Sequence, residues 1–294
     1  MSEHIKPFIK WQGGKSRTKD IIISHFKKFN IYIEPFLGSG AILFKLKPKK
    51  AIISDINTNL INTYMIIKKY KDIVMEKLDL HIKKYIPMNN ERRKIYFLKI
   101  RERYNNIKLY KSSIIEEKNI KIRIECAVLF IFINKTCFNG LYRENMKEKY
   151  NVSMGRYKHP KIYNKDIINS VSNYLNNNDI SILYGDYSNI LIYIRKHKIN
   201  IKNAIIYLDP PFYPLKKTSF TWYCGKKFEH IDHIKVFEFC KNINFTFYLS
   251  NSLCEVIKKL YKEYKIINIK VKRCGGGIKN KKNINTIECL IIGF

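Results

Sequence analysis

The residues best suited to chemistry lie in the stretch YLDPPFYP, residues 207–214. Asp209 directly follows an apolar run, and Pro210, Pro211 and Phe212 come next. An exocyclic amine on a nucleobase is a poor nucleophile because its lone pair is delocalised into the ring. A carboxylate and a fixed backbone carbonyl, each accepting one N–H, would draw that nitrogen towards tetrahedral geometry, while the aromatic ring stacks on the base. The prolines hold the carbonyl rigid because their φ is locked. An ordinary turn is the alternative for these four residues taken alone.

A second group of residues indicates a nucleoside ligand. EPFLGSG, residues 34–40, places Glu34 before a Gly-x-Gly turn that lets the backbone pass close to a ligand. Asp55 ends the next apolar run, where an acid accepts hydrogen bonds from ribose hydroxyls in dinucleotide-binding folds. The full GxGxxG pattern is absent, so a nucleoside without a pyrophosphate fits better than NAD or FAD. A plain tight turn is the alternative.

The stretch KWQGGK, residues 10–15, lies upstream of this turn. A phosphate-binding loop of the GxxxxGK[ST] type would need a glycine at position 9, which is Ile9, so an ATP site is excluded here. Trp11 in this stretch could equally be a core residue.

These residues must be positioned by strands that end at a common edge. Short apolar runs separated mainly by helical stretches predict strands at 30–35, 51–55, 180–186, 204–211, 245–251, 265–273 and 286–294. The alternation predicts an α/β fold with a doubly wound, mostly parallel sheet. The last two strands, joined by the loop CGGGIKNKKNIN, should pair antiparallel. Ligands bind at the carboxyl ends of such strands, so Glu34, Asp55 and Asp209 should gather along one edge, with Asp186 as a fourth acid.

A helical, strongly charged region interrupts the alternation. Segments such as ERRKIYFLKIRERY and IRIECAVLFIFINK have a helical pattern. We therefore expect one domain in two parts, residues 1–67 and 171–294, with a second domain inserted at residues 68–170.

Composition limits the class of protein. The 294 residues include 56 Lys and Arg against 24 Asp and Glu, a net charge of +32. This suits nucleic acid, although the codon bias of an AT-rich genome would explain part of the excess. The longest apolar run, residues 127–133, is too short to span a membrane. Without a signal segment, an intracellular protein, cytoplasmic or DNA-associated, is expected. The seven cysteines form no CxxC pair, so neither a zinc site nor disulfides are expected.

Several motifs, in this order, resemble those of the Dam-type, D12 class of DNA N6-adenine methyltransferases. The matching stretches are FIKWQGGKSR, IEPFLGSGA, ISDINTNLI, NKTCFNGLYRENMKEKYNVSMGRYKHP, YGDYSN, YLDPPFYP and SFTWY, which span residues 8–223. The resemblance implies a Rossmann-like, class I methyltransferase fold with an antiparallel final strand. The insertion would be a mainly helical target-recognition domain that contains a β-hairpin. It also implies an S-adenosylmethionine-dependent enzyme that needs no metal.

The resemblance also implies roles for individual residues. Cofactor contacts fall on Trp11, Lys15, Glu34, Phe36, Gly38, Ser39, Gly40, Asp55, Asp186, Tyr187 and Asp209. The FLGSG loop would lie beside the methionine part of the cofactor. Asp55 would contact its ribose, and Asp186 and Tyr187 would lie near its adenine. The catalytic residues would be Asp209, Pro210, Pro211 and Phe212, which hold the flipped target adenine. Phe212 departs from the tyrosine usual in the family, and stacking survives that change.

DNA contacts are implied for Lys10, Phe138, Asn139, Leu141 and Arg143. Phe138 would wedge into the base stack during base flipping, and Asn139 would hold a flanking phosphate. Leu141 and Arg143 would face base edges, and arginine suits guanine. The stretch MKEKYNVSMGRYKHP looks like a hairpin lying against the DNA backbone. The alternative places Phe138 in the core and Arg143 on a solvated surface.

The expected activity is methyl transfer to N6 of adenine in duplex DNA, with GATC as the first expectation, although residues 135–137 depart from the usual ones. Methylation of cytosine N4 and an inactive DNA-binding relative are the alternatives. RNA is a poorer substrate because its major groove is too narrow for such a reader. Double-stranded DNA is the expected partner, with no membrane. A cognate restriction endonuclease would be a second partner if the chain is half of a restriction–modification pair. The loop CGGGIKNKKNIN either touches phosphates or is a solvent loop.

Overall fold

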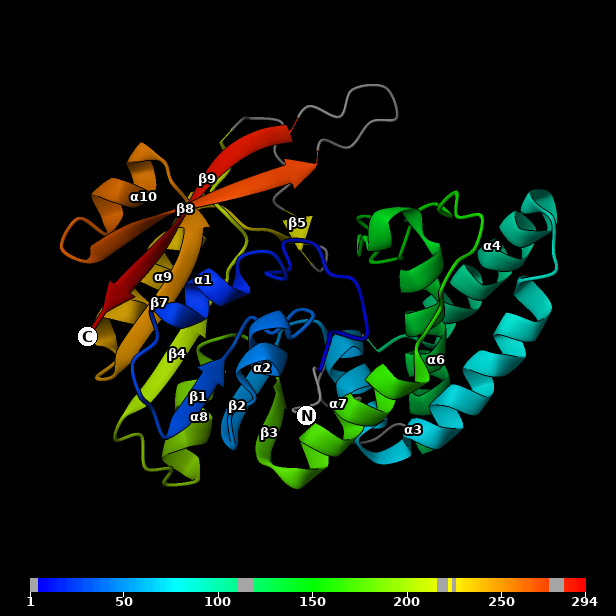
Figure 1. Ribbon diagram of the computed structural model, residues 1–294, viewed down its shortest axis with the longest axis horizontal. Helices are drawn as coiled ribbons and strands as arrows, with labels where there is room; N and C mark the ends of the chain where they lie inside the picture. The colour runs from blue at the N-terminus through cyan, green and yellow to red at the C-terminus, as the bar shows by residue number, and fades with distance from the viewer. Residues whose placement is uncertain (1–4, 110–118, 216–221, 224–225, 275–282) are drawn as a thin grey trace.

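The computed structural model describes residues 5–109, 119–215, 222–223, 226–274 and 283–294. A seven-stranded sheet in the order β3-β2-β1-β4-β7-β9-β8 forms its centre (Figure 1). The strands are β1 (Ile31–Glu34), β2 (Lys50–Asp55), β3 (Asp179–Tyr184), β4 (Ala204–Leu208), β7 (Thr246–Ser252), β8 (Lys265–Cys274) and β9 (Asn283–Gly293). The first five are parallel, and β9 runs antiparallel between β7 and β8. The expected mostly parallel sheet with an antiparallel final strand is confirmed.

Helices cover both faces of the sheet. The helices are α1 (Lys19–Ser24), α2 (Ala41–Leu46), α3 (Thr58–Tyr85), α4 (Asn90–Ile107), α6 (Ile120–Thr136), α7 (Lys165–Asn177), α8 (Asn189–Lys196), α9 (His230–Asn242) and α10 (Glu255–Leu260). In β4, Ile205 and Tyr207 join the apolar cluster that contains α2, α3 and α7, whereas Ile206 and Leu208 join the cluster that contains α8 and α9. Burial on both faces explains why these strands read as continuous apolar runs.

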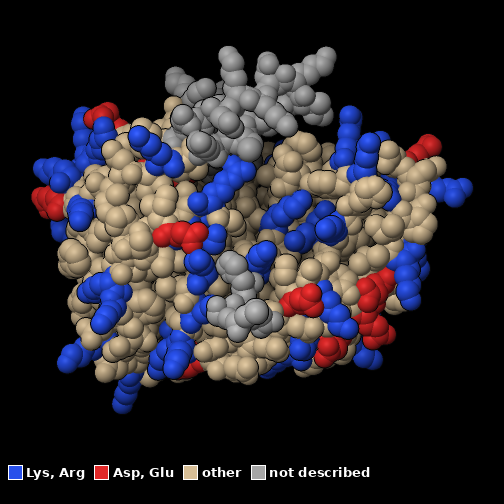
Figure 2. All heavy atoms as spheres, viewed as in Figure 1, with Lys and Arg blue, Asp and Glu red and all other residues tan. Residues whose placement is uncertain are grey.

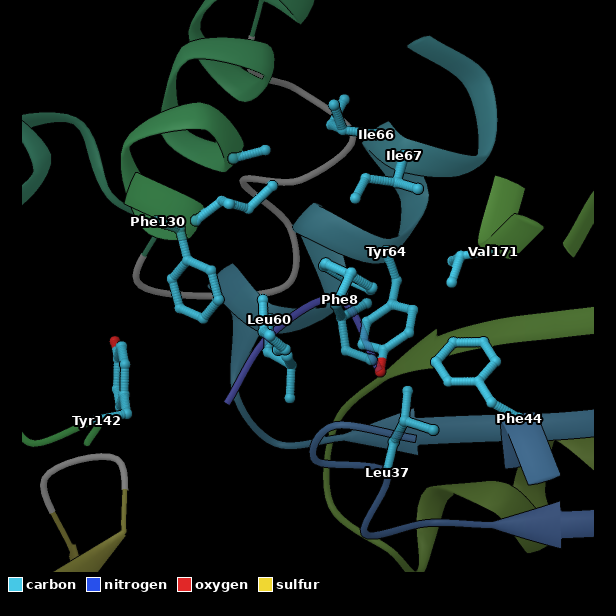
Figure 3. Close-up of a cluster of buried hydrophobic side chains, with 14 of the residues drawn as sticks. Phe8, Leu37, Phe44, Leu60, Tyr64, Ile66, Ile67, Phe130, Tyr142 and Val171 are labelled. Atoms are coloured by element: carbon cyan, nitrogen blue, oxygen red, sulfur yellow. The ribbon is translucent and has the colours of Figure 1, made fainter. Parts of the chain in front are cut away.

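The charged helical region is built from α3, α4 and α6 beside the sheet (Figure 1). Residues 126–134 of α6 are buried on every side, and the helix packs against both α3 and α4. Figure 3 shows Phe130 of α6 beside Leu60 of α3, with Tyr64 of α3 beside Phe8, in the same cluster as Leu37. The proposed boundary at residues 67 and 68 falls inside α3, three residues before helical geometry breaks at Tyr70 (φ −134°, ψ 33°).

The segment after α6 folds back on itself. A short 3-10 turn, η1 (Phe138–Gly140), is followed by a reversal at Asn145 to Lys149. Two isolated antiparallel bridges, Cys137 with Met154 and Glu144 with Tyr150, join its arms. The predicted hairpin is thus present as single bridges rather than as a continuous ladder in this described segment.

Two predicted features lie largely outside the described residues. The centre of the loop CGGGIKNKKNIN is one, and most of SFTWY is the other, of which the backbone of β5 (Trp222–Tyr223) is described and pairs with β6 (Lys226–Lys227). None of the helices in the described ranges is long and apolar enough to cross a bilayer.

Two glycines with a positive φ allow a stability test: Gly40, in the turn that precedes α2, and Gly13, in the 10–15 stretch. Gly40 has a φ of +67°, and an added Cβ would lie 2.9 Å from both the Phe44 ring and the Tyr64 hydroxyl. Gly13 has a φ of +76°, but a Cβ there would meet nothing within 4 Å. Left-handed strain costs about 1–2 kcal/mol. We expect Gly13→Ala to lower the free energy of unfolding by about that amount. Gly40→Ala should lower it by a further ~1–3 kcal/mol from overpacking. Denaturant unfolding measures both losses, and equal losses would contradict the packing account.

Candidate active site

The sheet brings the four strand-end acids to one edge. The strands that precede them, β1 to β4, are neighbours in the parallel part of the sheet. Two cavities open along this edge. The larger, about 760 Å³, is lined by Glu34, Asp55 and Asp209, and the smaller, about 670 Å³, by Asp186. Phe36, Tyr142 and Pro211 line both of them. Their sizes suit small-molecule ligands.

Asp209 is paired with Lys15 across 194 positions of sequence. The Lys15 ammonium lies 2.7 Å from each carboxylate oxygen of Asp209, and it also donates to the Gly13 carbonyl at 2.9 Å. The side chains of Lys15 and Asp209 are 6% and 17% exposed. The pKa of Asp209 is raised to about 6, mainly by burial; the Lys15 cation opposes this shift and the nearby Glu288 adds to it. The buried cation therefore favours the ionised form of the carboxylate.

The DPPF turn is fastened to the neighbouring strand β7. The backbone N–H of Tyr213 donates to the Asn251 side chain at 2.9 Å, and the Ser252 hydroxyl donates to the Tyr213 carbonyl at 2.8 Å. The Lys15 ammonium lies 4.6 Å above the Phe212 ring centroid. Pro210, Pro211 and Phe212 all line the larger cavity, as the sequence predicts for one site. Asn251 and Ser252 were missed, although polar residues at the end of the run FTFYLSN were a usable signal.

Asp55 is held in a fixed orientation by backbone donors. Its carboxylate accepts from the Gly38 N–H at 3.0 Å and from the Asn57 N–H at 2.9 Å, and its side chain is buried. The Gly-x-Gly turn and the strand-end acid are therefore one bonded unit. Ser39 lines the same cavity, and Gly40 begins α2 beside it.

Glu34 lies at the floor of the larger cavity and is buried. Loss of solvation raises its pKa well above the usual value, and the negative charges of Asp209 and Asp55 raise it further. This upward shift of the pKa favours the protonated form of Glu34, which offers an O–H donor.

Aromatic side chains wall both cavities. Trp11 stacks on Tyr142 with 5.6 Å between ring centroids and 25° between planes. Phe36 stacks on Tyr187 at 5.4 Å and 26°. Trp11 is half-buried and lines the larger cavity, whereas Asp186 and Tyr187 line the smaller one.

Two further cavity residues were not predicted. Tyr142 donates to Glu144 at 2.6 Å, and Glu144 pairs with the buried Lys108. No local pattern separates Tyr142 from its neighbours in the sequence. Glu288 of β9 is buried in the larger cavity, and an acid inside the apolar run TIECLIIGF was a usable signal.

The predicted DNA-contacting residues lie outside the two cavities. Phe138 is 53% exposed, so it is not a core residue. Lys10, Asn139 and Arg143 are exposed and Leu141 is half-buried. Arg143 donates from Nε to the Asn151 side chain at 2.8 Å, which orients its guanidinium. Figure 2 shows basic side chains along the middle of the face between the sheet and the helical region.

Metal ligation has no support in the described part of the chain, where no group of three or more His, Cys, Asp or Glu side chains is arranged to hold an ion.

The chain is similar to known proteins over nearly its whole length. A family model described as D12 class N6 adenine-specific DNA methyltransferase matches residues 11–274. Type II methyltransferase M.MjaIII of Methanocaldococcus jannaschii is 35% identical over 305 residues, covering 99% of each chain. Type II methyltransferase M1.LlaDCHI of Lactococcus lactis subsp. cremoris is 34% identical over 300 residues, 99% of this chain and 96% of its own. DNA adenine methylase of Escherichia coli is 27% identical over 287 residues, which cover 94% of this chain and 92% of its own.

The Lys15–Asp209 pair predicts a measurable change in acidity. In Lys15→Met the pKa of Asp209 should rise above its value of about 6, because burial and the Glu288 charge then act without the opposing cation. A carbon-detected NMR titration of the carboxyl carbon measures this. The control is Lys45→Met, which removes a lysine paired with the exposed Asp20 at 2.9 Å and should leave Asp209 unchanged. An unaltered Asp209 titration in Lys15→Met would refute the role given to the cation.

Proposed function

The chain belongs to the D12 class N6 adenine-specific DNA methyltransferase family, and from that premise we propose that it methylates adenine at a specific duplex site, with GATC as the expected sequence. The observation that carries the proposal is the Asp209 to Phe212 turn, which opens into the same cavity as Asp55. Asp209, the proposed acceptor for the target amine, and Asp55, the proposed acceptor for the cofactor's ribose, therefore belong to one site.

The cofactor of such an enzyme is S-adenosylmethionine, which supplies an electrophilic methyl group on a sulfonium. The residues fit it chemically. Asp55, already oriented by the Gly38 and Asn57 N–H groups, would accept from ribose hydroxyls. Phe36, with Asp186 and Tyr187, would wall the adenine in the smaller cavity. These assignments, like those of Trp11, Lys15, Glu34 and the 38–40 loop, are part of the proposal.

The target base is proposed to enter the larger cavity. Asp209 would accept one N–H of the adenine amine, the Pro210 carbonyl would accept the other, and Phe212 would stack on the ring. Both Asp209 oxygens lie 2.7 Å from Lys15, so the base amine would share this carboxylate with the ammonium. The fixed carbonyl and the ionised carboxylate then polarise the amine without any covalent bond to the protein.

The DNA reader is proposed to be the inserted domain, residues 68–170, between the catalytic parts 1–67 and 171–294. Exposure of Lys10, Phe138, Asn139 and Arg143 supports contact with the duplex. The terminal NH2 groups of Arg143 could bond guanine O6 and N7, which discriminates by about 1–3 kcal/mol. Leu141 would face the neighbouring base edge.

Two of the relatives are named Type II methyltransferases. These names support the proposal that the chain is site-specific and shares its site with a restriction endonuclease. Such a protein would act on intracellular DNA.

The activity is tested by sequencing plasmid DNA from a methylation-free host that expresses the chain, with modified bases detected directly. We expect N6-methyladenine confined to GATC, and none in cells that express Asp209→Ala, because the amine then loses its carboxylate acceptor. Methyladenine in another motif would overturn the GATC assignment alone. Methylcytosine, or no modification from folded protein, would overturn the proposed reaction.

Lys135 predicts a pH dependence of DNA binding. Burial, together with the nearby Lys10 cation, lowers the pKa of Lys135 to about 8. Its charge is present below pH 8 and is lost as the pH rises through that value. A duplex that contacts Lys135 should therefore bind about tenfold more weakly at pH 9 than at pH 7, the lower range for a charged hydrogen bond. Fluorescence anisotropy at constant ionic strength measures this. The Lys135→Arg variant keeps its positive charge from pH 7 to pH 9, so its affinity for DNA should not fall over that range. An equal fall in the wild type and the variant would exclude Lys135 as the cause of the pH dependence.

A further inference from the structure

One buried side-chain amide joins the two segments that carry the proposed DNA contacts. Asn134, in the last turn of α6, is 3% exposed. Its Oδ1 accepts from the Lys10 N–H at 2.9 Å, and its Nδ2 donates to the Lys10 carbonyl at 2.8 Å. The same Nδ2 donates to the Gly140 carbonyl at 3.3 Å. A single planar group therefore bonds both the N-terminal segment and the turn that carries Phe138.

Lys10 and this turn are also in direct contact. Gly140 has a φ of +66°, and a Cβ there would lie 2.4 Å from the Lys10 Cβ and 2.6 Å from its Cδ. The Lys10 ammonium lies 4.6 Å above the Tyr157 ring centroid. Its backbone is thus held by α6 and its charged end by the far arm of the folded-back segment.

Backbone pairing holds this segment only at isolated points. Its arms meet through two isolated bridges, with bonds such as those from the Phe138 N–H to the Ser153 carbonyl at 2.8 Å and from the Asn151 N–H to the Arg143 carbonyl at 3.1 Å. A second asparagine works in the same way: Asn105 of α4 accepts from the Tyr150 N–H at 2.8 Å and donates to its carbonyl at 3.1 Å. Side-chain amides of Asn134 and Asn105 therefore add to the backbone bonds that hold this segment.

We propose that Asn134 is a positioning residue for sequence discrimination, which fixes the distance between Lys10 and the Phe138–Arg143 segment. The inference rests on the proposed function. Reading base edges requires donors placed to within about 0.5 Å, and two separately mobile segments would not meet that requirement. Asn134 lines neither cavity among the described residues, so cofactor binding should not depend on it.

The amide is chemically specific for this task. It presents one acceptor and two N–H donors in a plane, which matches one N–H and two carbonyls. Aspartate keeps the acceptor but loses both donors, and its charge would face the Lys10 and Gly140 carbonyl oxygens. Asn134→Asp should therefore be at least as damaging as Asn134→Ala.

The test compares Asn134→Ala with Asn62→Ala. Asn62 is also buried, and it bonds the Arg123 carbonyl at 2.9 Å and the Arg123 Nε at 3.0 Å, joining α3 to α6 outside both cavities. The measured quantities are kcat/KM and the dissociation constant for the sequenced target duplex and for duplexes with one altered base pair. In Asn134→Ala and Asn134→Asp, discrimination should fall by about tenfold or more, with S-adenosylmethionine affinity within about twofold. Asn62→Ala should keep wild-type discrimination.

A double variant that combines Asn134→Ala with Lys10→Ala distinguishes a positioning role of Asn134 from a merely structural one. If Asn134 acts by placing Lys10, its loss should reduce discrimination much less in the Lys10→Ala background. Unchanged discrimination in both Asn134 variants, or a fully additive double variant, would overturn the inference. A wild type that binds its target selectively but methylates no adenine refutes the proposed function alone, because the dissociation constants still test Asn134. A wild type that shows no selectivity overturns both.

Discussion

The site depends on one electrostatic constraint: a carboxylate is forced out of water at the end of a strand that is buried on both faces. Parallel pairing of β4 with β1 and β7 fixes where Asp209 lies, and burial raises its pKa to about 6. Lys15 opposes that shift, and Asn251 and Ser252 anchor the backbone that follows. Glu34, Asp55 and Glu288 share the cavity, so the local charge is negative unless some acids are protonated. Burial first, and then the charges of Asp209 and Asp55, raise the pKa of Glu34 well above its usual value.

The second constraint is mechanical. No flexible linker joins the helical region to the sheet at this point, because α3 begins shortly after Asp55. This helix of 28 residues extends from the sheet into the helical region. Phe130, Tyr64 and Leu37 lie in one apolar cluster (Figure 3). Close-packed interiors resist small displacements. The relative placement of the cavity and the Phe138 turn is therefore set by packing across α3 and α6, and Tyr142 touches both sides.

Much of this architecture was predictable because it follows from short-range pattern. Apolar runs that end in acids predicted the strands and the common edge of Glu34, Asp55 and Asp209. What the sequence could not reveal depends on contacts between distant segments. The bonds of Asn134 to Lys10 span 124 positions, and Tyr142 meets Trp11 only in the folded chain. The expected hairpin is present as two single bridges, and the Asn105 side chain adds a bond to the Tyr150 N–H that no local pattern indicates. The residue-by-residue site assignments remain predictions drawn from the family resemblance.

Lys15 and the proposed target amine compete for the same acceptor. The ammonium lies on both Asp209 oxygens and above the Phe212 ring, which is where the amine and its base would be held. A cation in this position keeps the carboxylate ionised while no base is present, despite its burial. In the proposed binding mode, stacking on Phe212 and a bond to the Pro210 carbonyl would offset any weakening of this ion pair. A base with no exocyclic amine beside its ring edge offers no such replacement for the ammonium. The pair would therefore favour amine-bearing bases before any chemistry begins.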